Sequence, residues 1–227
     1  MTFKAYAETI FKVLLAYFNF FKRIDIVFDI YLENSLKAAT REKRGRGIKK
    51  RISAENRCPG NWMQFLKEDT NKKELNEFLA TTLTAKTYPS DRQLVTYQDR
   101  ALSNFGMTMP ECDHEEADTC ILHHVKHALS QNMTFIQILS NDTDVVIIAL
   151  GVYHMLRYDS IFDDIVIKYG MGKNHRKISI KNLAESLGQT RAQALVFFHA
   201  FTGCDTTSAF KNIGKKKLMK PLKLFLK

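Results

Sequence analysis

The sequence predicts an α/β fold with a mainly parallel central sheet flanked by helices. Short β-branched runs alternate along the chain with longer segments of helical periodicity, which is the pattern of strands covered by crossover helices. The chain has 227 residues, of which 45% are hydrophobic and 26% are charged, ordinary values for a globular protein. A chain of this length buries roughly 70% of its unfolded surface, so the fold needs no disulfide or metal to hold it together.

The predicted strands are short runs rich in Val, Ile, Thr and aromatic residues. Four such runs occur, at residues 24–28, 93–97, 134–139 and 165–169. The predicted helices carry apolar residues at spacings of three and four, and they lie at residues 2–22, 71–83, 116–130, 145–156, 180–187 and 191–201. Gly188 as a C-cap and Thr190 as an N-cap separate the last two helices.

The N-terminal segment and the cysteines together indicate a protein without a membrane span or a disulfide framework. Lys4, Glu8 and Lys12 interrupt the apolar N-terminus, and its longest uncharged run, Val13–Phe21, is too short to cross a bilayer. We therefore expect a buried amphipathic helix there. The four cysteines are scattered and form no CxxC pair, so we expect a reducing, intracellular compartment and no disulfide partner.

Basic residues are concentrated in two segments. The chain carries 34 Lys and Arg against 24 Asp and Glu, a formal net charge of +10. Residues 41–51 carry +6 and residues 211–227 carry +7, which leaves −3 for the rest of the chain. Most of that negative charge lies in residues 111–118, with five acids in eight residues. The basic segments point to a polyanionic partner, either nucleic acid or an anionic surface.

Six carboxylates fall where the predicted sheet would place a site, because sites in open α/β sheets form at the carboxyl ends of strands. They end strands, open helices or follow the last long helix: Asp29, Glu116, Asp118, Asp142, Asp144 and Asp205. If they converge, they repel one another unless a cation neutralises them, and oxygen ligands suit Mg²⁺ or Mn²⁺. Two such ions about 4 Å apart can activate water and stabilise the leaving oxygen of a phosphodiester.

Each acidic motif also has a purely structural interpretation. An Asp at a strand end is often a cap or a turn former. Asp142 and Asp144 fit an N-cap followed by a first-turn acid, and residues 111–118 fit a solvated loop. It is the order and spacing of the acids together that favour a metal site.

A zinc site is the alternative that the histidines suggest. His123 and His127 are neighbours on one predicted helix, near Cys112, His114 and Cys120. These residues fit no known ligand spacing, and the helix lacks the Glu of HExxH. We therefore expect no zinc, and we expect the histidines to face solvent or phosphate.

Four motifs in a fixed order resemble one family. They are VFD at 27–29, EAD at 116–118, NDTD at 141–144 and TGCD with IGKKK within 202–217. In this order they resemble the flap-endonuclease (Rad2-type 5′-nuclease) branch of the PIN-like domain superfamily, over most of the chain. The resemblance implies a Rossmann-like sheet whose acids bind two divalent ions. It also implies a PIN-like nuclease domain over residues 1–205 and a short basic helical DNA-binding remnant over residues 206–227.

The resemblance further implies which residues contact nucleic acid. Family members carry a basic, mobile segment after the VFD strand, which matches residues 40–61, although the run 41–51 alone also fits a solvated loop or a nuclear-import patch. The phosphate contacts implied there are Arg44, Arg46, Lys49 and Lys50. Lys37 and Arg44 would lie at the scissile phosphate. The helical turn near the C-terminus adds backbone amides and ammonium groups from Gly214, Lys215, Lys216 and Lys217.

Two departures from the family pattern bear on catalysis. The family begins with a strand that bears its own metal-binding Asp, upstream of the helix that residues 2–22 resemble, whereas this sequence starts in that helix. The first Gly of the helical turn is Asn212, and only a short tail follows Lys217. We therefore expect one metal ligand and a central strand to be missing, as in an N-terminally truncated copy.

Two classes of function follow from these observations. The first is a Mg²⁺- or Mn²⁺-dependent phosphodiesterase that acts on branched or single-stranded-ended DNA in the nucleus. The second is a catalytically inactive PIN-like module, or a gene fragment, that keeps nucleic-acid affinity through its basic segments. Salt-dependent binding without turnover distinguishes the second from the first.

Overall fold

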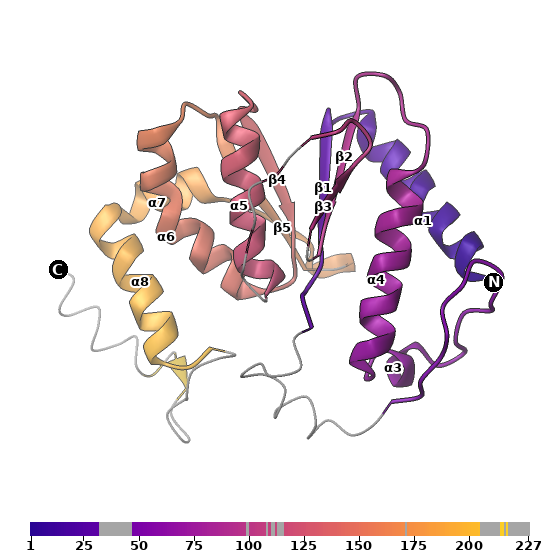
Figure 1. Ribbon diagram of the computed structural model, residues 1–227. Helices are drawn as coiled ribbons and strands as arrows, with labels where there is room; N and C mark the ends of the chain where they lie inside the picture. The colour runs from indigo at the N-terminus through magenta and orange to yellow at the C-terminus, as the bar shows by residue number, and fades with distance from the viewer. Residues whose placement is uncertain are drawn as a thin grey trace. The chain divides into compact units, whose positions relative to one another are not determined.

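The alternation of strands and helices in the sequence is reproduced in the structure (Figure 1). The computed structural model describes residues 1–31, 47–98, 100–107, 109, 112, 116–170, 172–204, 214, 215 and 217. Within these residues the chain forms seven α-helices and two three-stranded sheets. The mixed α/β class is therefore confirmed. Each sheet contains one parallel and one antiparallel pair, and the predicted Rossmann-like arrangement with a mainly parallel central sheet is not confirmed.

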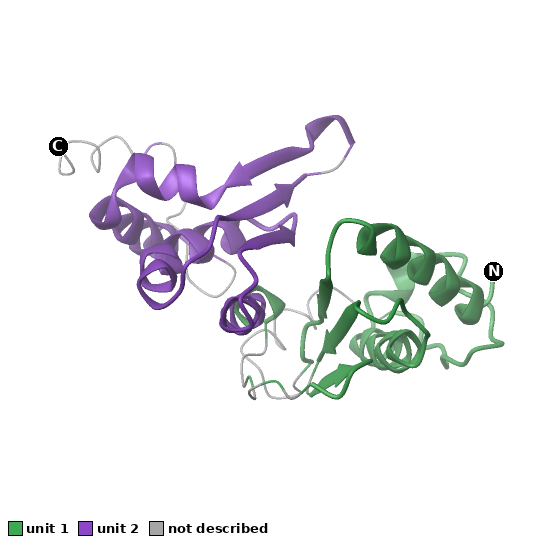
Figure 2. Cartoon of the chain, turned by 90° about the horizontal axis from the view of Figure 1, so that it is seen from above, with its two compact units in different colours: residues 1–120 green, residues 121–227 purple. Residues whose placement is uncertain are grey.

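The chain divides into two compact units, residues 1–120 and residues 121–227 (Figure 2). Helix α5 (Ala117–Ser130) begins in unit 1 and continues through unit 2. The prediction of one nuclease domain over residues 1–205 stays a prediction. Most of the predicted remnant over residues 206–227 lies outside the described residues.

Unit 1 joins a short sheet to helices. β1 (Arg23–Val27) pairs in parallel with β2 (Gln93–Tyr97), and β2 pairs antiparallel with β3 (Ala101–Ser103). Helix α1 (Phe3–Phe18) contacts β1, and α4 (Asp69–Thr84) contacts α1, β2 and β3. The short helix α3 (Trp62–Phe65) adds aromatic side chains to this core: the Trp62 ring contacts the rings of Phe3 and Phe65. Large core side chains with less than 2% exposure include Phe3, Phe65, Leu83 and Leu94.

The N-terminal segment forms the buried amphipathic helix that was predicted. The Thr2 hydroxyl caps α1 by accepting a hydrogen bond from the Ala5 backbone N–H at 3.2 Å. Phe3, Ala7, Leu14 and Phe18 are the buried residues of α1, and they repeat at helical spacing along one face. No helix among the described residues is both long enough and apolar enough to cross a membrane.

One ion pair lies inside the sheet of unit 1. Arg23 and Asp25 are two residues apart on β1, so their side chains share one face of the strand. The guanidinium of Arg23 donates to both carboxylate oxygens of Asp25, at 2.7 Å and 2.6 Å. The two side chains are only 4% and 16% exposed. Asp25 is therefore a structural acid, and it lies inside the strand that leads to Asp29.

Unit 2 has a sheet of the same kind. β4 (Phe135–Leu139) pairs in parallel with β5 (Asp164–Tyr169), and β5 pairs antiparallel with β6 (Arg176–Ser179). A turn containing a short 3-10 helix, η1 (Gly172–Asn174), joins β5 to β6. Helices α6 (Thr143–Asp159), α7 (Ile180–Leu187) and α8 (Gln189–Phe201) pack against one another, and α7 contacts β5. The core is mainly aliphatic, and its fully buried members include Val145, Leu150, Ile165, Ile167 and Ile180.

Two sequence predictions about local structure were incomplete or wrong. The antiparallel strands β3 and β6 were not predicted, because β3 has three residues and the RKIS sequence of β6 begins with two exposed basic residues. Gly188 does end α7, with a positive φ of 72° that favours glycine. Thr190 is not the N-cap of α8, because α8 begins directly after Gly188.

Candidate functional site

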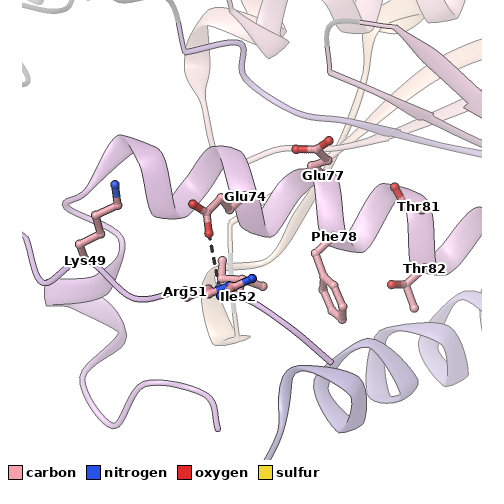
Figure 3. Close-up of a pocket in the computed structure, with 8 residues that line it drawn as sticks. All are labelled: Lys49, Arg51, Ile52, Glu74, Glu77, Phe78, Thr81 and Thr82. Atoms are coloured by element: carbon pink, nitrogen blue, oxygen red, sulfur yellow. Dashed lines mark hydrogen bonds between the residues drawn. The ribbon is translucent and has the colours of Figure 1, made fainter. Parts of the chain in front are cut away.

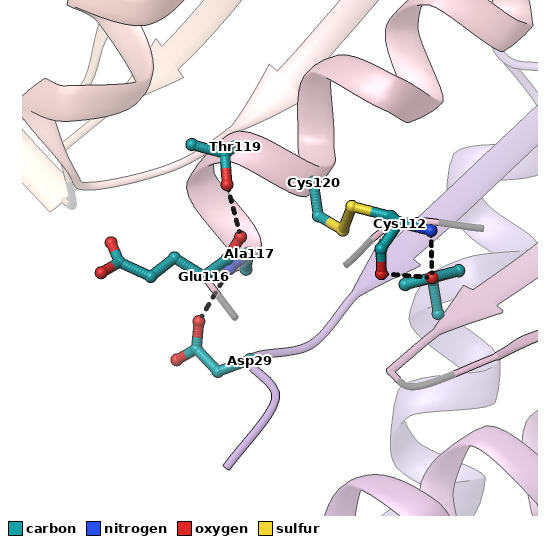
Figure 4. Close-up of a disulfide and its surroundings, with 7 residues drawn as sticks. Asp29, Cys112, Glu116, Ala117, Thr119 and Cys120 are labelled. Atoms are coloured by element: carbon teal, nitrogen blue, oxygen red, sulfur yellow. Dashed lines mark hydrogen bonds between the residues drawn. A yellow bond between two sulfur atoms is a disulfide. The ribbon is translucent and has the colours of Figure 1, made fainter. Parts of the chain in front are cut away.

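Asp29 follows β1 in the chain, and its side chain contacts the first residue of α5. Its Oδ1 accepts a hydrogen bond from the backbone N–H of Ala117, the first residue of α5, at 3.0 Å (Figure 4). The first N–H groups of a helix have no partner within the helix, and the helix dipole is positive there, so this position stabilises the carboxylate. The hydrogen bond places Asp29 beside Glu116, which immediately precedes Ala117 (Figure 4). The structure therefore brings together two of the six predicted carboxylates within unit 1.

Asp118 lies one residue further on, in the first turn of α5. An acid in this turn interacts favourably with the helix dipole. Both Asp118 and Glu116 are partly exposed, and Asp29 is exposed. The acidic end of α5 is therefore open to solvent rather than packed into the core of unit 1.

A disulfide joins the acidic segment to α5. Cys112 and Cys120 have Cα atoms 6.5 Å apart, within the usual range for a disulfide, and both residues are buried. The Tyr97 hydroxyl accepts a hydrogen bond from the Cys112 backbone N–H at 2.9 Å and donates one to its carbonyl at 3.0 Å (Figure 4). The expectation of no disulfide was therefore wrong for this pair. The pairing depends on Tyr97 and α5 holding both ends of the segment, which CxxC spacing does not reveal.

In unit 2, Asp142 and Asp144 lie at the start of α6. Asp142 is the N-cap of α6, and its Oδ1 accepts a hydrogen bond from the Asp144 backbone N–H at 2.8 Å. The loop before α6 is held by two more bonds. Ser140 Oγ accepts from the Asp142 N–H at 3.0 Å, and Asn141 Oδ1 accepts from the Gly170 N–H at 3.0 Å. The capping role that was one interpretation of the DTD motif is therefore present.

The side chain of Asp144 contacts His199 of α8. His199 Nε2 lies 2.8 Å from Asp144 Oδ1, and His199 Nδ1 lies 2.9 Å from Lys215 Nζ. A lysine ammonium can only donate, so Nδ1 accepts and the Nε2–H donates to Asp144. The imidazole is thereby held in one tautomer between a carboxylate and an ammonium group. His199 was not predicted from the sequence, although its place six residues before Asp205 was a signal.

A close approach of α6 and α8 supports this contact. A Cβ on Gly151 of α6 would lie 2.5 Å from Cγ2 of Val196 on α8. No side chain larger than hydrogen fits there without a shift. Gly151 therefore lets the two helices approach each other, which places His199 within reach of Asp144.

The basic residues predicted to contact nucleic acid are only partly described. Lys37, Arg44, Arg46, Lys216 and the predicted metal ligand Asp205 lie outside the described residues. Gly214 and Lys217 are exposed, and the Lys217 N–H bonds the Gly214 carbonyl in a helical turn at 2.9 Å. The Lys50 backbone N–H is bonded to Asn71. Lys49 lines a pocket of about 790 Å³ whose lining also contains Glu74 and Glu77 (Figure 3).

The described carboxylates do not by themselves form a complete metal site. Carboxylate oxygens are the ligands that Mg²⁺ and Mn²⁺ prefer. Within the described part of the chain, however, no group of three or more His, Cys, Asp or Glu side chains is placed to hold a metal ion. In unit 1, Asp29 and Glu116 both lie at the start of α5. In unit 2, one oxygen of Asp144 already accepts the His199 hydrogen bond.

No protein-family model, no curated protein and no solved structure matches the chain.

Proposed function

We propose that this chain is a metal-dependent phosphodiesterase that resembles the structure-specific 5′-nucleases and acts on nucleic acid, DNA in preference to RNA. The observation that carries the proposal is the hydrogen bond from Ala117 to Asp29. It joins the VFD and EAD motifs, 88 residues apart, at one solvent-exposed helix start. Two divalent ions, Mg²⁺ or Mn²⁺, belong to this proposal, with Asp29 and Glu116 as the first ligands to test.

The basic residues supply the second part of the proposal. Lysine and arginine bind phosphates without regard to sequence, and their affinity falls steeply with salt. Lys49, Lys50, Lys215 and Lys217 are the described residues of the predicted set whose ammonium groups would make such contacts. A nuclear location, which the basic run 41–51 favours, is part of the same proposal.

A catalytically inactive nucleic-acid-binding module is the second candidate. It is favoured by the structural partners that three of the acids already have. Asp29 caps α5, Asp142 caps α6 and Asp144 pairs with His199. Acids with these roles stabilise helix ends whether or not a metal binds, so their positions in the sequence would persist after loss of catalysis.

The two candidates are separated by one cleavage experiment. Purified full-length protein is incubated with labelled flap DNA and Mn²⁺, beside the variants Asp29→Asn and Glu116→Gln. Asp159→Asn, at an exposed position at the end of α6, is the matched control. Wild type and control are expected to cleave. Both site variants are expected to lose about a hundredfold or more, since even the outer-shell partners of a metal contribute roughly 10–100-fold.

Other outcomes assign the chain differently. Salt-dependent DNA binding by wild type without any cleavage favours the inactive module. Equal cleavage by all four proteins points to a contaminating nuclease and overturns the assignment of Asp29 and Glu116. Absence of both binding and cleavage overturns both candidates.

A further inference from the structure

The pocket in unit 1 lies between an extended segment and one face of α4 (Figure 3). Its volume of about 790 Å³ falls in the range of small-molecule sites, roughly 300–1,000 Å³. The extended segment supplies Lys49, Arg51 and Ile52. Helix α4 supplies residues at spacings of three, four, seven and eight, which share one helix face: Glu74, Glu77, Phe78, Thr81 and Thr82.

The wall opposite α4 is held in place by a buried amide. Asn71 is 1% exposed, and its Nδ2 donates to the carbonyls of Ile48 at 2.8 Å and Phe65 at 2.9 Å. Its Oδ1 accepts from the Lys50 N–H at 3.0 Å. A buried amide with three hydrogen bonds is costly to disturb, because removal of one partner leaves a buried polar group unsatisfied. The segment that carries Lys49 and Arg51 is therefore anchored to α4.

The two walls carry opposite charges: Lys49 and Arg51 lie on the extended segment, and Glu74 and Glu77 lie on α4. Among the ion pairs between described residues, none involves Lys49, Arg51 or Glu77. Glu74 accepts a long hydrogen bond of 3.4 Å from the Ile52 N–H through one oxygen, and its other oxygen is not engaged in that bond. A ligand that satisfies both walls carries an anionic group at one end and hydrogen-bond donors at the other.

We infer that this pocket binds a nucleotide whose base carries an exocyclic amino group. The guanidinium of Arg51 and the ammonium of Lys49 suit a phosphate. Phe78 offers an aromatic ring for a base, and a glutamate accepts hydrogen bonds from the amino group of cytosine. The hydroxyls of Thr81 and Thr82 both donate and accept, as the sugar hydroxyls do. An amino acid would satisfy the two charges but would leave the aromatic ring and the hydroxyls without a role.

The choice of a nucleotide rests on the proposed function, since the substrate proposed there is a nucleic-acid strand. The pocket would hold one nucleotide of that strand away from the acidic end of α5. Binding of a mononucleotide involves no bond cleavage and no metal ion. Mononucleotide binding can therefore be measured in EDTA, where a metal-dependent nuclease is inactive. A failure to bind the nucleotide then counts against this inference, and a failure to cleave DNA with Mn²⁺ counts against the nuclease proposal.

The test is a titration of the ¹⁵N-labelled full chain with CMP, UMP and cytidine in EDTA, followed by amide chemical shifts. We expect saturable shifts in Lys49–Ile52 and in Glu74–Thr82, with CMP binding about tenfold tighter than UMP. Arg51→Gln is expected to weaken CMP about tenfold and to leave cytidine unchanged. Glu77→Gln is expected to abolish the preference for CMP over UMP. Lys67→Gln, at an exposed position that does not line the pocket, is the matched control.

Three results would overturn the inference. One is the absence of saturable shifts at these amides at millimolar CMP. Another is tighter binding of diglycine than of CMP, which would make this a site for zwitterions. The third is CMP binding by Arg51→Gln that equals wild type. Asp29 does not line the pocket, so Asp29→Asn is expected to bind CMP as wild type does even if that variant no longer cleaves DNA.

Discussion

His199 donates a hydrogen bond from Nε2 to Oδ1 of Asp144 at 2.8 Å, and so joins the last turn of α8 to the first turn of α6. The two residues are 55 positions apart in the chain. Their side chains are 16% and 22% exposed, so the contact is largely shielded from water. Asp144 is a predicted metal ligand, and His199 also bonds Lys215, a predicted phosphate contact. One imidazole therefore orients two of the residues on which the proposed function depends.

Replacement of His199 tests this arrangement. His199→Leu removes both hydrogen bonds and is expected to destabilise unit 2 by about 1.5–3 kcal/mol, the usual value for hydrogen bonds to charged groups. His199→Gln keeps one donor and one acceptor and should recover part of that loss. Hydrogen exchange of the α6 and α8 amides measures the effect. His175→Leu, at an exposed position, is the control, and an equal effect of both leucine variants would contradict the assignment.

Gly151→Ala tests the close approach of α6 and α8. The added Cβ would meet Val196 Cγ2 at 2.5 Å, so we expect a loss of about 1–3 kcal/mol from overpacking. Val196→Ala in the same chain should restore part of the stability by removing the clashing methyl groups. Gly60→Ala is the matched control, because a Cβ there meets no atom within 4 Å. Urea unfolding followed by circular dichroism compares the four proteins, and equal loss in both glycine variants would refute the steric explanation.

Arg23→Met tests the buried ion pair of β1. The substitution removes the guanidinium that donates to both carboxylate oxygens of Asp25, whose side chain is only 16% exposed, and we expect a loss of about 3–5 kcal/mol. The only tryptophan, Trp62, lies in unit 1 and reports its unfolding in urea by fluorescence. Lys4→Met is the control, since the pair of Lys4 with Glu55 is 64% and 80% exposed and should change stability by less than about 1 kcal/mol.

Reduction tests the link between Cys112 and Cys120. The disulfide closes a loop over a sequence separation of eight, for which the chain-entropy model predicts a stabilisation of about 2–3 kcal/mol. We expect dithiothreitol to lower the free energy of unfolding by this amount in wild type and in Cys58→Ser, but not in Cys112→Ser. Intact mass under non-reducing conditions should be two hydrogens below that of the reduced chain. A fully reduced mass for protein purified without reductant would show that the thiols are unpaired.

Tyr88 gives a prediction about high pH. Burial raises the pKa of Tyr88 from 10.0 to about 12, and its hydroxyl donates to the Leu83 carbonyl at 3.0 Å. The folded state therefore keeps this proton where the unfolded state loses it. The contribution to stability is complete below pH 10 and is lost as the pH rises from 10 to about 12. Burial also raises the pKa of Tyr153, so tyrosinate absorbance should show a late-titrating component that is smaller, but still present, in Tyr88→Phe. An identical curve in that variant would contradict the prediction.

The six longer helices and the four longer strands were predictable because their signals are local, whereas the four-residue helix α3 was not predicted. Residues such as Phe3, Ala7 and Leu14 repeat at helical spacing, and a run such as QLVTY at 93–97 is β-branched enough to predict a strand. Strands β3 and β6 were not predicted because β3 has only three residues and β6 begins with two exposed basic residues, whereas β1 and β4, which also lie at sheet edges, have clear apolar runs. Thr190 was a good cap in sequence, but α8 starts at Gln189, with Gly188 as its N-cap, so Thr190 lies inside the helix.

The candidate site divides in the same way. The acids at strand and helix ends were found from their positions alone, since capping and strand-end placement depend on neighbouring residues. The partners of those acids were not. Which side chain faces Asp144, and whether Cys112 reaches Cys120, depends on how helices and loops pack.

By itself, the sequence determined the α/β class, the positions of the principal helices and strands, the placement of acids at their ends and the concentration of positive charge in two segments. These follow from periodicity and composition over a few residues. Only the tertiary structure decided that Asp29 caps α5, that His199 lies between Asp144 and Lys215, that Cys112 pairs with Cys120, and that Lys49 and Arg51 form a pocket with α4. Such contacts join residues distant in the chain, and their free energy comes from burial and packing that exist only once each unit has folded.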